Sequence, residues 1–364
     1  MSSKVYIIAE IGVNHNGSVE LAKEMIIAAA KAGADAVKFQ TFISERSVTA
    51  IAPKAEYQKE KTLATNTQLE MLKSLEMPFE AYRELIDTCA EYGVDFLTTP
   101  SDYESLDFIM EIKPDIKWLK VSSGDVTNAP LLLKIAQTGK PVIFSTGMAT
   151  IGEIELALGT LAFGYMHKDE QPSGIADIKS AYNSLAGQEI LKRKIILLHC
   201  TTQYPTNPQD VNLKAMDTLK DIFDFPVGYS DHTQGGAISV AAVARGSVVI
   251  EKHFTTSHQL PGPDQAASME PQLFKQMVED IRKVEIALGS GRKLPTAVEL
   301  QNSPVVRKSI VADRLIFKGQ EFSEENIIPK SPEGGISPFY YWDLLGKCAK
   351  RDYANDEMID FHIE

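Results

Sequence analysis

The sequence predicts a (β/α)₈ barrel of the TIM-barrel class, followed by a small mostly-β domain. Three observations lead to this prediction. Eight short apolar runs occur within residues 1–292, with helical stretches between most of them. Polar residues stand where these runs end, and the hydrophobic pattern changes after Arg292. The chain of 364 residues is long enough for two domains and a large buried core.

The eight apolar runs are the predicted strands of the barrel. Ser18 is the expected N-cap of the first helix, and Gly93 is the expected C-cap of the helix before the third strand. An open doubly wound sheet is the alternative, but no glycine-rich dinucleotide fingerprint follows the first strand. The predicted strands cover residues 5–9, 35–39, 95–99, 117–121, 141–145, 194–199, 227–229 and 248–251.

Two insertions interrupt the predicted barrel. Residues 44–76 form a polar stretch after the second strand, on the face where barrels carry catalytic loops. Residues 164–193 follow the fifth helix, and a lid, an interface element or a tolerated insertion are all open interpretations of them.

The domain boundaries follow from the same pattern. The barrel domain is predicted for residues 1–292, a linker for residues 293–303 and the mostly-β domain for residues 304–364. Short strands at 309–312 and 327–329, with a polar turn at 317–320 between them, are expected in the last part.

Composition and charge narrow the classes of partner. The formal net charge of −12 disfavours nucleic acid and anionic membranes. No apolar run approaches the roughly 18 residues of a membrane span, and the N-terminus lacks the apolar core of a secretory signal. The three cysteines are far apart, with no CxxC spacing. We therefore expect a cytoplasmic protein.

Polar residues at the carboxyl ends of the strands are the candidate site, because barrel enzymes place their active sites on that face. Lys38 and Lys120 end two buried strands, where a lysine cannot easily extend its amine to water. With Thr99, Ser123 and Ser145 they predict a cradle for a small anion that carries phosphate and carboxylate groups. Asp125, in the turn after the fourth strand, is a further substrate-binding candidate.

His232 and His253 follow the seventh and eighth strands, and each stands near a carboxylate. A single histidine beside a strand is usually structural, but two at adjacent strand ends indicate a metal site or acid–base chemistry. Glu10, Asp231, Glu251 and Asp264 are candidate orienting or sugar-binding groups, with helix capping and ion pairing as alternatives. His15 and His199 are left unassigned.

A series of motifs along the barrel resembles the sialic acid synthases, which condense phosphoenolpyruvate with an N-acetylmannosamine-type sugar to a nine-carbon sialic acid. The tail resembles the antifreeze-protein-like (SAF, β-clip) domain of that family. In chain order the motifs are IAEIGVNHNGS, GADAVKFQT, KVSSGDVTN, STGMAT, LLHCTTQYPT, VGYSDHT, VIEKHFT and PGPDQAASM.

The resemblance implies a divalent metal ion, typically Mn²⁺ with Mg²⁺ or Co²⁺ as alternatives, held by His232 and His253. It implies a homodimer in which each tail domain closes the barrel mouth of the partner. It places Glu251 beside the reacting centre, with Glu10 and Lys120 as the other catalytic candidates. It places sugar contacts at Glu10, Tyr204 and Asp264. The implied phosphoenolpyruvate contacts are Lys38, Gln40, Thr99, Lys120, Ser123, Ser145, Thr202 and Ser230.

The tail departs from the family pattern. The family's loop commonly reads KRPG, with an arginine that reaches the sugar, whereas here the loop is Lys330-Ser331-Pro332-Glu333. The stretches APKAEYQ (52–58) and QLEMLKSLE look more like N,N′-diacetyllegionaminate synthases than neuraminate synthases. They favour 2,4-diacetamido-2,4,6-trideoxymannose as the acceptor, with N-acetylmannosamine as the alternative. The pseudaminate branch fits less well, because its loop after EKHF lacks PGPD.

Two other classes of function remain as rivals. One is a barrel aldolase that forms a Schiff base through Lys120 or Lys38. The other is a non-enzymatic sugar-binding or SAF-type interaction protein, whose missing arginine reflects lost catalysis.

Overall fold

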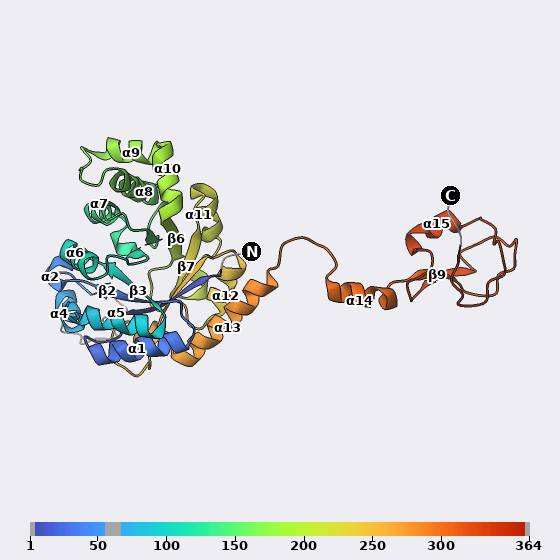
Figure 1. Ribbon diagram of the computed structural model, residues 1–364, viewed down its shortest axis with the longest axis horizontal. Helices are drawn as coiled ribbons and strands as arrows, with labels where there is room; N and C mark the ends of the chain where they lie inside the picture. The colour runs from blue at the N-terminus through green and yellow to red at the C-terminus, as the bar shows by residue number, and fades with distance from the viewer. Residues whose placement is uncertain (1–3, 55–66, 361–364) are drawn as a thin grey trace. The chain divides into compact units, whose positions relative to one another are not determined.

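The computed structural model describes residues 4–54 and 67–360 of the chain. The chain divides into two compact units between Gly289 and Ser290, and each unit has its own hydrophobic core (Figure 1). Among the described residues, no helix is both long enough and apolar enough to cross a membrane.

The first unit is a closed barrel of parallel strands, which confirms the predicted fold class. The strands follow one another around the barrel in chain order, and β8 pairs with β1 to close it. Their bounds are β1 Tyr6–Gly12, β2 Ala36–Thr41, β3 Asp95–Pro100, β4 Leu119–Val121, β5 Val142–Ser145, β6 Ile195–Cys200, β7 Val227–Asp231 and β8 Val249–His253.

Helices surround the barrel (Figure 1). The expected caps are present: the Ser18 hydroxyl accepts a hydrogen bond from the backbone N–H of Leu21 (3.2 Å), and Gly93 ends α5 with a left-handed φ of 70°. The helices around the barrel are α1 Val19–Lys31, α5 Ala81–Tyr92, α6 Tyr103–Ile112, α7 Ala129–Gln137, α8 Ile151–Met166, α11 Ala215–Phe223, α12 Ala237–Ala244 and α13 Pro271–Ala287.

Inside the barrel, an apolar layer lies beneath a polar one. The buried apolar side chains of Ile8, Ala36, Leu97, Ile143, Leu198 and Val249 form one cluster. Because side chains alternate between the two faces of a strand, the residue two positions further along also points inward. In six strands that next residue is polar and lines a pocket: Glu10, Lys38, Thr99, Ser145, Cys200 and Glu251. The apolar layer thus supports the floor of the pocket.

The strands extend further than predicted. β1 continues to Gly12, β7 to Asp231 and β8 to His253. Glu10 and His253 were expected just beyond their strands, but both lie inside them, paired in register across β1 and β8. The ladder of backbone hydrogen bonds, rather than a loop, therefore fixes the direction of these side chains.

The insertion at 164–193 forms an outer layer over α8. It contains α9 Ile175–Asn183 and α10 Leu185–Lys194, and α9 packs on α8 so closely that a Cβ added to Gly159 would lie 2.8 Å from the carbonyl of Ile178. Figure 1 shows these helices beside α8. Because α7 packs on another side of α8, buried residues occur all round this helix.

The insertion at 44–76 is described only in part, because residues 55–66 lie outside the described residues, as does most of the stretch 52–58. Its two ends form helices α2 Ser44–Ser47 and α4 Gln68–Leu75. The Glu76 carboxylate accepts a hydrogen bond from the backbone N–H of Ser44 (2.8 Å), which joins the two ends.

The two short strands predicted for the second unit are present, as β9 Ser309–Ala312 and β10 Ile327–Lys330, and they pair in an antiparallel sheet. Part of the predicted linker 293–303 is helical, because α14 Ala297–Val306 begins within it, capped by Thr296. In the tail loop, Lys330 pairs with Asp313 (3.0 Å) and Asp356 (2.7 Å). The Ser331 hydroxyl donates to the carbonyl of Val306 (3.0 Å).

Candidate active site

A polar pocket of about 190 Å³ opens at the carboxyl ends of the barrel strands. The structure brings to it every predicted site residue except Asp125, Asp231 and Asp264. The predicted residues that line it are Glu10, Lys38, Gln40, Thr99, Lys120, Ser123, Ser145, Thr202, Tyr204, Ser230, His232, Glu251 and His253.

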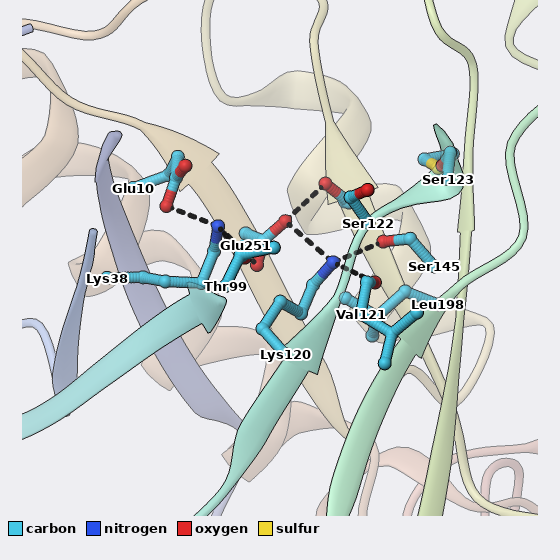
Figure 2. A network of polar contacts seen from close by, with 12 residues as sticks. Glu10, Lys38, Thr99, Lys120, Val121, Ser122, Ser123, Ser145, Leu198 and Glu251 are labelled. Carbon is cyan, nitrogen blue, oxygen red and sulfur yellow. Dashed lines mark hydrogen bonds and ion pairs between the residues drawn. The ribbon is translucent and has the colours of Figure 1, made fainter. Parts of the chain in front are cut away.

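Lys38 bridges two buried carboxylates in the pocket (Figure 2). Its Nζ lies 2.6 Å from Glu10 Oε2 and 3.8 Å from Glu251 Oε2, and its side chain is only 5% exposed. Burial lowers the pKa of Lys38, but attraction to Glu10 and Glu251 raises it by more, so its pKa lies above the ordinary value. Lys38 is therefore a fixed positive charge.

Lys120 has a different environment. Its Nζ donates to the Ser145 hydroxyl (2.6 Å) and the Val121 carbonyl (2.9 Å), whereas the nearest carboxylate oxygen, on Glu251, is 3.8 Å away (Figure 2). Burial lowers the pKa of Lys120, and the charge of Lys38 lowers it further, although Glu251 raises it. An incoming anion could bring negative charge closer to Lys120 than Glu251 does.

Glu251 lies between the two lysines and accepts a hydrogen bond from the Ser230 hydroxyl (2.8 Å). Burial raises the pKa of Glu251, but Lys120 and Lys38 lower it by more, so Glu251 is ionised at neutral pH. The pKa of Glu10 is raised, first by burial and also by the charge of Glu251, against the opposing effect of Lys38. The two carboxylates therefore differ in proton affinity, as in acid–base sites.

The turn after β5 brings backbone close to three pocket side chains. The backbone N–H of Gly147 donates to the Ser123 hydroxyl (3.0 Å), and that hydroxyl lies 3.1 Å from Cys200 Sγ. A Cβ added to Gly147 would lie 2.5 Å from Thr202 Oγ1 and 2.6 Å from Ser123 Oγ. Only glycine fits this turn without displacing the hydroxyls that face the pocket.

His232 and His253 lie side by side, with ring centroids 5.5 Å apart, and Tyr204 packs on His232 at 4.1 Å. The Thr201 carbonyl lies 2.6 Å from His232 Nδ1 and accepts its hydrogen, so the lone pair is on Nε2, which lies 3.3 Å from the Ser230 hydroxyl. Burial lowers the pKa of His232 to about 4. Burial also lowers the pKa of His253 well below its ordinary value, and electrostatic interaction with His232 lowers it further. Both rings are therefore neutral at pH 7, which is the form that ligates metals.

The pair fits a divalent cation with few protein ligands. Within the described part of the chain, His253 Nδ1 is buried and has no hydrogen-bond partner, so this face of the pocket holds an unsatisfied nitrogen. The described residues contain no group of three or more His, Cys, Asp or Glu side chains that could hold a metal ion. A cation on these two histidines would take its other ligands from substrate and water, as in an open catalytic site.

The structure leaves Asp125 and Asp264 outside the pocket lining. Asp125 lies in a 3₁₀ turn, η1 Ser123–Asp125, where its carboxylate accepts hydrogen bonds from the side chains of Ser122 (2.6 Å) and Asn128 (3.1 Å). These local hydrogen bonds therefore occupy both carboxylate oxygens of Asp125. Asp264 is buried, and it is close enough to Glu10 for the charge of Glu10 to act on its carboxyl group.

Asp264 predicts a pH dependence of stability. Burial, together with the charge of Glu10, raises the pKa of Asp264 to about 7. A raised carboxyl pKa means that the folded state binds the proton more tightly, so stability falls as pH rises from about 4 to 7. At roughly 1.4 kcal/mol per pKa unit, the loss is up to roughly 4 kcal/mol. We expect Asp264→Asn to reduce this loss, measured by urea unfolding at pH 5 and pH 8.

The partly exposed residue Asp280 provides the matched control. Hydrogen bonds from Lys283 and Gln276 lower its pKa, so Asp280→Asn should leave the difference in stability between pH 5 and pH 8 unchanged. Identical pH profiles for the wild type and Asp264→Asn would contradict the raised pKa.

Sequence reasoning did not include four lining residues among its candidates: Ser101, Ser122, Gly124 and Cys200. Cys200 stands two positions after Leu198, which is the inward spacing that Lys38 and Ser145 also show. The alternation of β6 was therefore a usable signal. Ser101 follows β3 directly, and its position depends on the turn into α6, which strand periodicity does not reach.

The site lies at the carboxyl face of a closed barrel and contains buried lysines, an ionised carboxylate and neutral histidines. These features define an enzyme site built to bind an anion. A sequence model of the NeuB family matches residues 25–293, and one of the SAF domain matches residues 307–362. The chain therefore belongs to the NeuB family and carries a SAF domain, which confirms the resemblance to sialic acid synthases.

Individual relatives agree with this assignment. The chain is 45% identical to an N,N′-diacetyllegionaminic acid synthase of Campylobacter jejuni, over 98% of this chain and 99% of that protein. It is 43% identical to an N,N′-diacetyllegionaminic acid synthase of Legionella pneumophila, over 100% and 96%. Its fold matches an N-acetylneuraminic acid (sialic acid) synthetase from Leptospira borgpetersenii, solved in complex with citrate. For that structure the TM-score is 0.65 and the identity 33%, with 83% of this chain and 90% of that chain covered.

Proposed function

We propose that this enzyme condenses phosphoenolpyruvate with an N-acetylmannosamine-type sugar, giving a nine-carbon sialic acid and inorganic phosphate. The observation that carries the proposal is the buried charge arrangement in the pocket. Lys38 is satisfied by Glu10, whereas Lys120 has hydroxyl and carbonyl partners and its nearest carboxylate oxygen lies 3.8 Å away.

In the proposed reaction, C3 of phosphoenolpyruvate bonds to the aldehyde carbon of the sugar, water adds to C2, and the bond from C2 to the phosphate oxygen breaks. The water loses two protons, of which one reaches the former aldehyde oxygen and the other leaves with inorganic phosphate, so the atoms balance. Lys120, with Ser145 and Ser123 nearby, holds the phosphate and carboxylate groups, and Lys38 adds positive charge from the Glu10 side. Glu251, ionised between the two lysines, is placed to accept a proton from the water.

We propose further that His232 and His253 hold a divalent cation, Mn²⁺ first among the candidates and Mg²⁺ or Co²⁺ after it. Such a cation would polarise the sugar carbonyl as a Lewis acid. The chain's own contribution is to present two neutral imidazoles beside the anion cradle, with the His232 tautomer set by the Thr201 carbonyl.

The proposed acceptor is 2,4-diacetamido-2,4,6-trideoxymannose. The two relatives named as N,N′-diacetyllegionaminic acid synthases match this chain at 45% and 43% identity over nearly all of its length. N-acetylmannosamine is the alternative acceptor. The tail loop carries Ser331 where many synthases have an arginine, so the acceptor must be recognised without that side chain.

We also propose a domain-swapped homodimer that works in the cytoplasm. The second unit exposes Phe339 (90%) and Trp342 (74%), an apolar surface that a partner would cover. The mass of the full-length protein in solution, measured by light scattering, tests the proposed dimer. The three cysteines are free thiols, which suits a reducing compartment.

The test of function is phosphate release from phosphoenolpyruvate by the purified full-length protein, with and without Mn²⁺. 2,4-Diacetamido-2,4,6-trideoxymannose and N-acetylmannosamine are offered in parallel reactions. We expect metal-dependent release with the first sugar. Release with N-acetylmannosamine alone would make the enzyme a neuraminate synthase, and release with neither sugar would overturn the proposal.

Glu251→Gln separates binding from chemistry. The amide keeps the shape of the side chain and removes its charge, so we expect kcat to fall by about 10²–10⁴ through loss of the base. The Kd for phosphoenolpyruvate should stay the same or decrease, because a negative charge has left the cradle. Steady-state kinetics and calorimetry measure the two effects. Glu45→Gln, at an exposed pair with Lys73, is the control, and an unchanged kcat for Glu251→Gln would remove Glu251 from the chemistry.

A Schiff-base aldolase is the second candidate, because burial lowers the pKa of Lys120 and so favours a neutral, nucleophilic amine. Borohydride trapping with pyruvate distinguishes it: a covalent adduct on Lys120 would support the aldolase, and its absence supports the proposed synthase.

A further inference from the structure

Strands β7 and β8, which position the two histidines, also carry a buried charge pair on their outer face. Asp231 in β7 is 0% exposed and Lys252 in β8 is 1% exposed. Because side chains alternate along a strand, Asp231 points away from the pocket between Ser230 and His232, and Lys252 does so between Glu251 and His253. Neither residue lines the pocket, and the proposed chemistry uses neither.

The pair holds the peptide groups of Thr233, the residue after His232. The Asp231 Oδ1 atom accepts hydrogen bonds from the Thr233 N–H (2.8 Å) and hydroxyl (2.7 Å). Lys252 Nζ donates to the Thr233 carbonyl and lies 3.1 Å from Asp231 Oδ2. That oxygen also accepts from the Ser239 hydroxyl in α12 (2.6 Å). Asp231 and Lys252 are direct neighbours in the β7–β8 register.

These bonds restrain His232 from its carboxyl side, while other bonds restrain it from the pocket side. The His232 carbonyl accepts from the Thr206 N–H (2.9 Å), and its ring Nδ1 donates to the Thr201 carbonyl (2.6 Å). His253 directly follows Lys252 in β8, so one ion pair ties together the two backbone segments that carry the rings.

Stability alone gives a weak reason for such a pair. A buried ion pair loses the hydration of both charges, and well-packed apolar residues often replace it with little loss of stability. An apolar pair, however, could not bind both the N–H and the carbonyl of Thr233. The bonds of the pair therefore account better for a fixed position of the Thr233 backbone than for a gain in stability.

We propose that Asp231 and Lys252 are positioning residues, which hold His232 and His253 at the spacing and orientation that a divalent cation requires. This inference rests on the proposed metal role of the two histidines. The pair acts through the backbone at Thr233 and does not touch the substrate.

The test measures Mn²⁺ binding to the metal-free full-length protein by calorimetry for Asp231→Asn, Lys252→Met and the double variant. We expect each to bind Mn²⁺ about tenfold or more weakly than the wild type, as for other outer partners of metal ligands. The melting temperature of the double variant should recover toward that of the wild type, because no charge stays buried alone, whereas its Mn²⁺ affinity should not recover. Binding of inorganic phosphate should be unchanged in all variants.

Arg282→Met is the matched control. Arg282 pairs with Asp35 (2.8 Å) and donates to the carbonyl of Val5, near the amino ends of the strands, so its loss should lower the melting temperature without changing Mn²⁺ affinity. If Asp231→Asn fails to fold, Ser239→Ala removes only one of the bonds to Asp231 and should produce a smaller weakening of Mn²⁺ binding.

Wild-type Mn²⁺ affinity in the variants would overturn the inference, and so would recovery of both affinity and melting temperature in the double variant. Failure of the wild type to bind Mn²⁺ would instead overturn the metal proposal. The positioning claim is then decided by nuclear magnetic resonance of the metal-free protein. The His232 Nδ1 hydrogen should exchange slowly in the wild type and faster in Asp231→Asn, and equal exchange would overturn the claim.

Discussion

His232→Ala is expected to abolish turnover, with a loss of about 10³-fold or more, while the barrel stays folded. The ring contributes a neutral nitrogen to the proposed cation site, and its partner His253 has an unsatisfied buried Nδ1 within the described structure. Removal of one of two protein ligands should eliminate tight Mn²⁺ binding, because the remaining imidazole alone binds weakly. Phosphate-release assays and Mn²⁺ calorimetry measure the two losses together.

His199→Ala is the matched control for this variant. His199 also lies at the end of its strand, but its Nε2 atom hydrogen-bonds the Val211 carbonyl (2.7 Å), its ring packs near Tyr229, and it does not line the pocket. We expect His199→Ala to lower stability and to keep Mn²⁺ affinity. Near-normal turnover by a rigorously metal-free His232→Ala protein would rule out the metal assignment.

Lys38→Met is expected to reduce turnover by about 10³-fold and to destabilise the fold. The substitution removes the cation that Glu10 contacts at 2.6 Å, and it leaves a buried carboxylate without its partner. Loss of one member of a buried pair typically costs about 3–5 kcal/mol. The pKa of Glu10, already raised by burial, should rise further, so Glu10 would fold with its proton on.

This gives Lys38→Met a defined pH signature. With its raised pKa, Glu10 keeps its proton in the folded variant at a pH at which the unfolded chain releases it. The unfolding free energy of the variant should therefore fall further below that of the wild type as pH rises above about 4.5. Urea unfolding at pH 5 and pH 8 measures the change. Lys23→Met, which removes an exposed pair with Glu84, should show no such trend. A pH-independent deficit for Lys38→Met would contradict the proposed role of Lys38 as the partner of Glu10.

The strand pattern made most of the candidate site predictable. Lys38, Ser145 and Glu251 were found because each ends an apolar run, and the runs are real strands of a barrel. The same alternation would have found Cys200. Asp125 shows the limit of this reasoning: it also follows a strand, but a 3₁₀ turn directs its carboxylate to Ser122 and Asn128.

The tail shows a second limit. Helix α14 begins at Ala297, inside the predicted linker. Thr296 and Glu299 form a capping box there, in which each side chain accepts a hydrogen bond from the other residue's backbone N–H. Threonine followed three residues later by glutamate was visible in the sequence. The absence of a clear apolar stripe in that segment concealed the helix.

The sequence by itself determined the barrel, its tail domain and the face on which the chemistry lies, because period-two strands and polar strand ends are local patterns. Only the tertiary structure decided which charges meet. The lysines at 38 and 120 look alike in the sequence, yet one faces two carboxylates and the other mainly a hydroxyl and a carbonyl, so their pKa values move in opposite directions. Asp231 and Lys252 likewise stand beside site residues in the sequence, and only the pairing of β7 with β8 brings them together as a buried ion pair. Burial and partner distance set these differences, and both depend on strands that are far apart in the chain.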